Sequence, residues 1–194
     1  LAARNRPLQR VASVASFFLS RIDVLLDPKF EQIVKARGPS ARLAAELQGK
    51  VAIACAKVAA NIYQRIFSSE RFRILADKGA RTQRLLWAST STKNPAYPDL
   101  KYVEPLIGPD TINTLPLQTL TAYRDHGQPA IRLPEGLSEA QSTIARLAEL
   151  RIDLDGIAER LEAQGESKFN EAYDLLMRTL AKTRERILDR RLAA

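Results

Sequence analysis

A run of hydroxyl side chains that ends in a lysine lies near the middle of the chain. The apolar segment 85–88 leads to Lys93 through four consecutive hydroxyl residues: Ser89, Thr90, Ser91 and Thr92. A buried hydroxyl without a hydrogen-bond partner is costly, so the run must bond either backbone carbonyls or a bound anion. An ammonium group beside alcohols is suited to hold phosphate oxygens.

A second pairing of a hydroxyl with a cation occurs near the amino terminus. In "VASFFLSR", Ser16 lies on a predicted strand and Arg21 follows five residues later, past the strand end. The planar guanidinium offers a fork of N–H donors to phosphate. Carboxyl ends of neighbouring parallel strands meet at one edge of a sheet, so the two cations predict a phosphate site there. On the residues alone, Arg21 and Lys93 could equally be surface charges in loops.

Three predicted strands alternate with predicted helices. The strands are 10–18, 84–90 and 110–116, and the helices are 27–38, 39–67, 69–79, 117–127 and 137–150, followed by a helical C-terminal third. A short helix or turn is expected at 99–108, and Ser138 is the expected N-cap of the helix at 137–150. Continued as a strand, the hydroxyl run places Ser89 and Ser91 on one side and Thr90 and Thr92 on the other.

This alternation is typical of an α/β fold with a parallel sheet. Three strands are too few to close a (β/α)₈ barrel. The sheet is therefore either small and open or part of a barrel, and residues 1–194 are expected to form a single domain. The start without a Met favours the partial barrel.

Composition narrows the classes of function. The net charge of +8 is spread over the helices, and no nucleic-acid-binding motif is present, so a nucleic-acid partner is not expected. No apolar run has the length that spans a membrane. The single Cys55, on an apolar helical stripe, is expected in the core, and this usage fits a reducing compartment. The only histidine, His126, is expected to be a helix cap or a surface group.

Four segments resemble one known family. "VASVASFFLSRID", "GKVAIACAKVA", "RLLWASTSTKNPAYPDLKYVEPLIGPDTINTLP" and "YRDHG" are similar to the transaldolases of the longer bacterial subfamily. The resemblance implies a (β/α)₈ TIM barrel and a cytoplasmic enzyme of the pentose phosphate pathway. It also implies transfer of a dihydroxyacetone unit from sedoheptulose 7-phosphate to glyceraldehyde 3-phosphate through a lysine Schiff base, without a metal or other cofactor.

The resemblance also implies roles for single residues. Ser16 matches a serine on the family's strand six, and Arg21 matches its phosphate-binding arginine. On strand seven Ser89 matches a serine. The family has a second phosphate-binding arginine after this serine, and the cation nearest to that position here is Lys93, which is offset from it. Four further residues are expected to line the active site: Phe18, Thr90, Ser91 and Asn113.

The family's Schiff-base lysine and acid–base carboxylates lie upstream of strand six, where this chain begins. The resemblance therefore implies a C-terminal part of the barrel, with extra C-terminal helices and without the Schiff-base lysine. The missing half of the barrel is expected on the same polypeptide or on another chain, and copies could also associate. Two alternatives stay open: a non-catalytic sugar-phosphate-binding or interaction module, and the transaldolase part of a fusion with a sugar-phosphate isomerase.

Overall fold

The computed structural model describes residues 1–4 and 6–192, with side chains up to residue 188. It divides into two units, residues 1–152 and 153–194, which are described separately.

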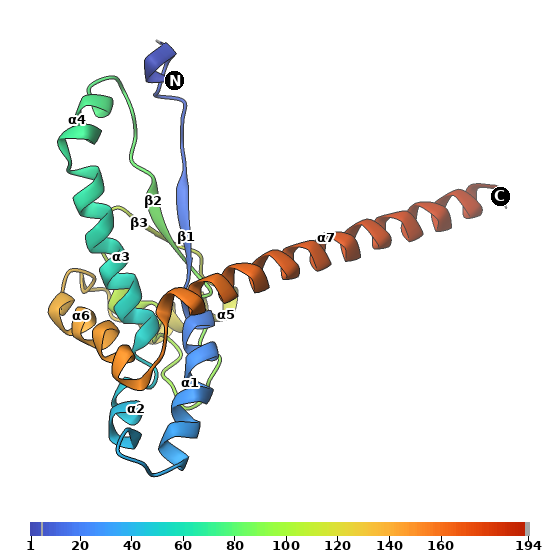
Figure 1. Ribbon diagram of the computed structural model, residues 1–194. Helices are drawn as coiled ribbons and strands as arrows, with labels where there is room; N and C mark the ends of the chain where they lie inside the picture. Colours follow the sequence, from blue (N-terminus) through green and yellow to red (C-terminus); the bar gives the residue numbers. More distant parts are fainter. Residues whose placement is uncertain (5, 193–194) are drawn as a thin grey trace. The chain divides into compact units, whose positions relative to one another are not determined.

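A three-stranded parallel sheet lies at the centre of the first unit. Strands β1 (Val14–Phe18), β2 (Arg84–Ala88) and β3 (Thr111–Asn113) lie side by side in the order β1-β2-β3 (Figure 1). The parallel α/β architecture predicted from the sequence is thus confirmed, although each strand is shorter than predicted. All three strands run from the end of the unit that holds the amino terminus towards α1.

The strand register assigns side chains to the two faces of the sheet. Phe17 pairs with Trp87, which pairs with Asn113. This face is covered, because Trp87 is only 1% exposed and contacts the Phe17 ring edge-on, with 6.0 Å between ring centroids. The row one residue back contains Ser16 and Leu86, and Ser16 is exposed. One face of the sheet is therefore buried and the other is open.

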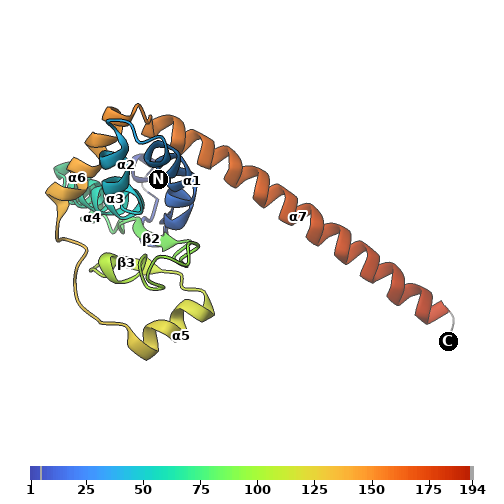
Figure 2. The same cartoon turned by 90° about the horizontal axis from the view of Figure 1, so that it is seen from below.

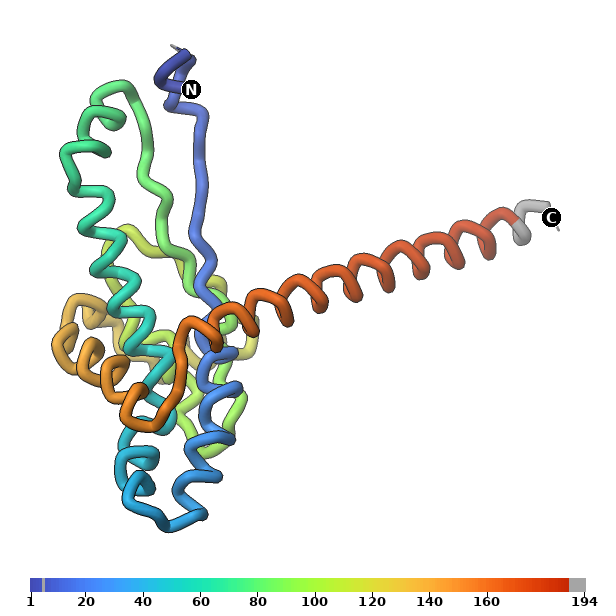
Figure 3. Tube along the Cα trace, viewed as in Figure 1, coloured from blue at the N-terminus to red at the C-terminus, as the bar shows by residue number. Residues whose placement is uncertain are grey.

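In the described part of the first unit, six helices and three short 3₁₀ turns accompany the strands, and Figure 3 traces the path of the chain through them. They are η1 (Ala2–Arg4), α1 (Leu19–Lys35), α2 (Ala41–Leu47), α3 (Val51–Phe67), α4 (Glu70–Ala76), η2 (Glu104–Leu106), α5 (Leu117–His126), α6 (Leu137–Ala145) and η3 (Arg146–Leu150).

Helix α3 supplies much of the core, because small apolar residues line its inner side. Val51, Ala52 and Ala56 are fully buried, and α3 packs against both α1 and α6 (Figure 2). Cys55 lies on the same side, where burial raises the pKa of its thiol to about 12. The thiol is therefore protonated, as the prediction of a core cysteine requires.

Three predicted helix boundaries were wrong. Helix α1 begins at Leu19 instead of residue 27 and contains Pro28; Pro28 and Val24 are both exposed, so water can reach the carbonyl that the proline cannot bond. The predicted long helix at 39–67 is broken between α2 and α3, where Gly49 has a left-handed backbone (φ 70°). The N-cap of α6 is Gly136, and Ser138 lies inside the helix.

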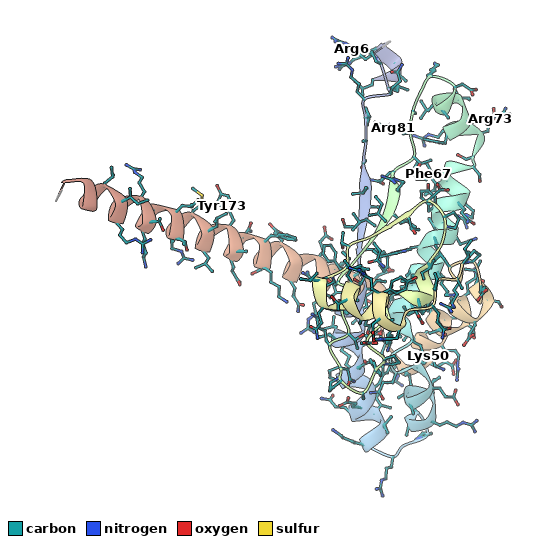
Figure 4. All side chains as sticks on the ribbon, turned by 180° about the vertical axis from the view of Figure 1, so that it is seen from behind. Arg6, Lys50, Phe67, Arg73, Arg81 and Tyr173 are labelled. Carbon is teal, nitrogen blue, oxygen red and sulfur yellow. The ribbon has the colours of Figure 1, made fainter. Side chains whose placement is uncertain are left out.

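The second unit contains one long helix, α7 (Leu154–Leu192). Asp153 precedes it, and its Oδ1 accepts a hydrogen bond of 3.1 Å from the backbone N–H of Asp155, which caps the first turn. Large apolar side chains on this helix are exposed, among them Phe169 and Tyr173; Figure 4 shows Tyr173 projecting from it.

Among the described residues, no helix combines the length and apolar character that crossing a bilayer requires.

Gly49 gives a test of the turn between α2 and α3. A Cβ at this position would lie 2.5 Å from Lys101 Nζ and 2.6 Å from Tyr97 Oη, and the backbone is left-handed. We expect Gly49→Ala to lower the free energy of unfolding by about 1–3 kcal/mol. Gly38→Ala is the matched control, because nothing lies within 4 Å of a Cβ there. Urea denaturation of both variants checks this, and equal stabilities would contradict it.

His126 gives a test of the contact between α5 and the segment after β2. Its Nε2 lies 3.1 Å from Asp99 Oδ1, and its Nδ1 lies 3.3 Å from Asp125 Oδ2. Asp99 first, and then Asp125, raise the pKa of His126 above its ordinary 6.5. Because the folded pKa is raised, the stabilising contribution is complete below the unfolded pKa and is lost as the pH rises through the folded one.

We expect Asp99→Asn to lower the pKa of His126 and Asp110→Asn to leave it unchanged. The chain has a single histidine, so its proton NMR titration reads this group alone. A pKa that is the same in wild type and Asp99→Asn would show that the contact does not form in solution.

Candidate functional site

The segments that follow the three strands lie side by side. The backbone N–H of Ser20 donates to the carbonyl of Ser89 at 3.1 Å, and the backbone N–H of Thr114 donates to the carbonyl of Trp87 at 2.9 Å. Thr90 Oγ1 donates to the carbonyl of Thr114 at 3.1 Å. The carboxyl ends of the strands therefore form one continuous edge, as the sequence predicted.

Arg21 follows the end of β1, as predicted, and lies in the first turn of α1, because the helix follows the strand directly. The alternative that Arg21 is a surface charge in a loop was therefore wrong. Its guanidinium carbon lies 4.6 Å from the centroid of the Phe18 ring, an arrangement that holds the cation by its attraction to the ring face. Among the described side chains, Arg21 has no carboxylate within 4 Å. Its N–H donors are therefore open to another anion.

The hydroxyl run does not continue strand β2. The strand ends at Ala88, and Ser89 has a left-handed backbone (φ 52°). This turn changes the chain direction, so the predicted alternation of Ser89 and Ser91 against Thr90 and Thr92 was wrong.

The hydroxyls of the run have different partners. Thr90 is fully buried and bonds the carbonyl of Thr114. Thr92 Oγ1 donates to the carbonyls of Pro98 at 2.9 Å and Asp99 at 3.2 Å. Backbone carbonyls thus satisfy both threonines, which leaves Ser89 and Ser91 as the hydroxyls that could face a ligand.

Lys93 is exposed, and its Nζ donates to Ser91 Oγ at 2.7 Å. It lies within 4 Å of no carboxylate among the described side chains. The edge therefore carries two cations that are not neutralised, each with an uncharged neighbour. Other arginines, Arg6, Arg73 and Arg81, lie towards the opposite end of the strands (Figure 4).

The remaining predicted residues divide between the two faces of the sheet. Ser16 and Phe18 belong to the open face, since they alternate with Phe17. Asn113 shares the covered face with Trp87, and its Oδ1 is buried without a hydrogen-bond partner, as is Trp87 Nε1. The structure therefore brings Asn113 next to Trp87 and not next to Ser16.

Two hollows lie elsewhere along α3. One is lined by Lys57, Asn61, Leu85 and Thr111, where β2 and β3 begin, and the other lies between α3 and α6. Neither is lined by the cations of the edge. Among the described residues, no group of three or more His, Cys, Asp or Glu side chains could hold a metal ion.

Sequence reasoning missed a pair of buried carboxylates on α1. Asp23 is 1% exposed and Asp27 is 6% exposed. Asp23 Oδ1 accepts from the N–H of Ala52 and Oδ2 from the Tyr102 hydroxyl, each at 2.9 Å. Asp27 Oδ1 accepts from the N–H of Gly49 at 2.9 Å and Oδ2 from the Tyr97 hydroxyl at 2.8 Å. Every carboxylate oxygen of the pair therefore has a donor.

Lys101 completes this network. Its Nζ lies 3.6 Å from Asp23 Oδ2 and 3.2 Å from the centroid of the Tyr97 ring. Burial raises the pKa of Asp23, against the hydrogen bonds from Ala52 and Tyr102 that lower it. Burial also lowers the pKa of Lys101, against the attraction of Asp23. The signal that could have found the network is an acid pair at i and i+4 on the apolar side of a helix.

Comparison with known proteins gives the family. The family described as transaldolase/fructose-6-phosphate aldolase matches residues 1–180. The chain is 47% identical over 176 residues to a transaldolase of Thiobacillus denitrificans, covering 91% of this chain and 47% of that protein. It is 45% identical over 183 residues to a transaldolase 2 of a Nostoc species, covering 92% and 48%.

The chain thus spans about half the length of the curated relatives it matches. These similarities show that the chain belongs to the transaldolase/fructose-6-phosphate aldolase family.

Proposed function

We propose that this chain supplies the phosphate-binding side of a transaldolase, the C-terminal part of its barrel. The reaction transfers a dihydroxyacetone unit from sedoheptulose 7-phosphate to glyceraldehyde 3-phosphate. The relatives named transaldolase support the reaction class, and the edge formed by the strand ends supports the role of this chain in it.

One contact carries the proposal, the hydrogen bond from the Ser20 N–H to the Ser89 carbonyl. It joins the segment that carries Arg21 to the segment that carries Ser89 and Lys93. A phosphate dianion needs several donors and compensating charge from more than one side. Two neighbouring segments, each with a cation that has no carboxylate partner among the described side chains, meet this requirement.

In this proposal the side chains have distinct tasks. The Arg21 guanidinium binds two phosphate oxygens, with Phe18 beneath it fixing the plane of the fork. Lys93 adds a point charge, and Ser91 orients its ammonium. Ser89 and Ser16 offer hydroxyl groups, Ser89 to the phosphate and Ser16 to the sugar on the open face. α1 starts at the same edge without an acidic residue in its first turn, so its positive end also favours an anion.

The proposed reaction also needs a lysine for its covalent step. In that step the amine adds to the ketose carbonyl and water leaves, giving an imine whose protonated form accepts the electron pair of the cleaved carbon–carbon bond. Lys57 donates to the carbonyls of Arg132 and Glu135 at 2.9 and 2.6 Å, and Lys101 lies against Asp23. We therefore assign the Schiff-base lysine to a part of the enzyme outside this chain.

Loss of either cation should weaken binding of the phosphorylated sugar. We expect Arg21→Ala and Lys93→Ala to weaken sedoheptulose 7-phosphate binding roughly tenfold to a hundredfold, since a hydrogen bond to a charged group contributes about 1.5–3 kcal/mol. Lys35→Ala, at the far end of α1, is the control for net charge. Isothermal titration calorimetry measures the affinities, and unchanged affinity in Arg21→Ala would refute the phosphate role.

Reductive trapping separates the binding role from catalysis by this chain. We expect borohydride with sedoheptulose 7-phosphate to leave the chain unmodified, because Lys93 lies in a solvated position and is bonded to Ser91. Mass spectrometry detects any adduct. A trapped adduct on Lys93 would contradict the assignment of the Schiff-base lysine to a part of the enzyme outside this chain. It would make Lys93 the Schiff-base residue.

A further inference from the structure

We propose that Tyr97 and Asp27 are positioning residues that hold Lys93 at a fixed place relative to Arg21. This inference rests on the proposed function, since it concerns how the two phosphate-binding cations keep their spacing. It assigns a task to a buried carboxylate and a half-buried tyrosine that are not among the proposed phosphate contacts.

The segment 91–99, which carries Lys93, is closed on itself. Thr92 Oγ1 bonds the carbonyls of Pro98 and Asp99, which joins the two ends of the segment. Inside it, Asn94 Oδ1 accepts from the N–H of Ala96 at 2.9 Å, and the N–H of Tyr97 donates to the carbonyl of Asn94 at 3.1 Å. A segment with so many internal bonds moves as one body, so a contact at Tyr97 controls Lys93.

Tyr97 fastens this body to helix α1. Its hydroxyl donates to Asp27 Oδ2 at 2.8 Å, and Asp27 is itself fixed through Oδ1 by the N–H of Gly49. Arg21 lies six residues before Asp27 on the same helix, a rise of roughly 9 Å at 1.5 Å per residue. The rigid helix α1 therefore links the Arg21 guanidinium to Asp27, where Tyr97 holds the segment 91–99.

Lys101 strengthens this attachment from the other side. Its Nζ lies over the Tyr97 ring at 3.2 Å from the centroid and is drawn to Asp23 at 3.6 Å. The Tyr97 ring is thus held between a cation on its face and a carboxylate at its hydroxyl. Because Tyr97 is restrained twice, the segment 91–99 loses little further freedom when Lys93 binds a ligand. Such preorganisation raises affinity.

The test compares two tyrosines that each lose one hydrogen bond to a buried aspartate. Tyr97→Phe removes the 2.8 Å bond to Asp27, and Tyr102→Phe removes the 2.9 Å bond to Asp23. Tyr102 lies beyond the closed segment, so its loss should lower stability without freeing Lys93. Hydrogen–deuterium exchange of residues 91–99 measures the freedom of the segment, and calorimetry measures the affinity for sedoheptulose 7-phosphate.

We expect Tyr97→Phe to speed exchange in residues 91–99 and to weaken binding roughly threefold to tenfold, the range of one lost hydrogen bond. Tyr102→Phe should leave both readouts as in wild type at a temperature where each variant is folded. In a Lys93→Ala background, Tyr97→Phe should have no further effect on affinity, because its effect acts through that lysine.

Three results would overturn the inference, and they differ from a failure of the proposed function. Unchanged exchange in Tyr97→Phe would show that the hydroxyl does not hold the segment. Equal losses of affinity in the two tyrosine variants, or the same loss with and without Lys93, would show a general structural effect. If Arg21→Ala and Lys93→Ala both bind as wild type, the phosphate site itself is wrong, and the positioning role falls with it.

Discussion

The need to satisfy two buried carboxylates governs the arrangement of the helices and loops around α1. A buried carboxylate that loses a partner costs about 3–5 kcal/mol, so Asp23 and Asp27 must keep their donors. Two of these donors come from the backbone where α3 begins, and two come from the tyrosines after β2. The start of α3 and the segment after β2 are therefore both tied to the helix that follows β1.

The hydroxyl run in the segment after β2 serves two purposes. Thr90 and Thr92 bond backbone carbonyls and so stabilise the turn out of β2 and the closure of the following segment. Ser91 instead accepts from Lys93. The hydroxyl run thus contains residues that stabilise the edge and residues that can face a ligand. The left-handed backbone of Ser89 marks where the run leaves the strand.

The sequence was informative where a pattern is local and silent where it is not. Apolar segments separated by helices predicted three parallel strands. The positions of Arg21 and Lys93 after two of these strands predicted that both cations lie at the carboxyl edge of the sheet. The start of α1 could not be predicted, because its N-cap is Phe18, which offers no capping side chain. The position of Asn113 follows from its register with Trp87, which leaves no local signal. The spacing of Asp23 and Asp27 is a local signal for a buried acid pair, but the partners of Asp27 lie 22 and 70 positions away and could not be predicted from it.

The open face of the sheet is consistent with the proposed function and with a chain that spans about half the length of its relatives. Val14 and Ser16 are exposed on β1, and a parallel sheet is normally covered on both faces. In a closed barrel the inner face is covered by the other strands, and in the proposed enzyme the same closure would bring the lysine of the covalent step towards Ser16. A helix laid on this face would bury Ser16 but would leave β1 and β3 with unpaired edges. Completion by further strands would solve both problems at once, so the binding edge and the open face both support the proposed division of the enzyme.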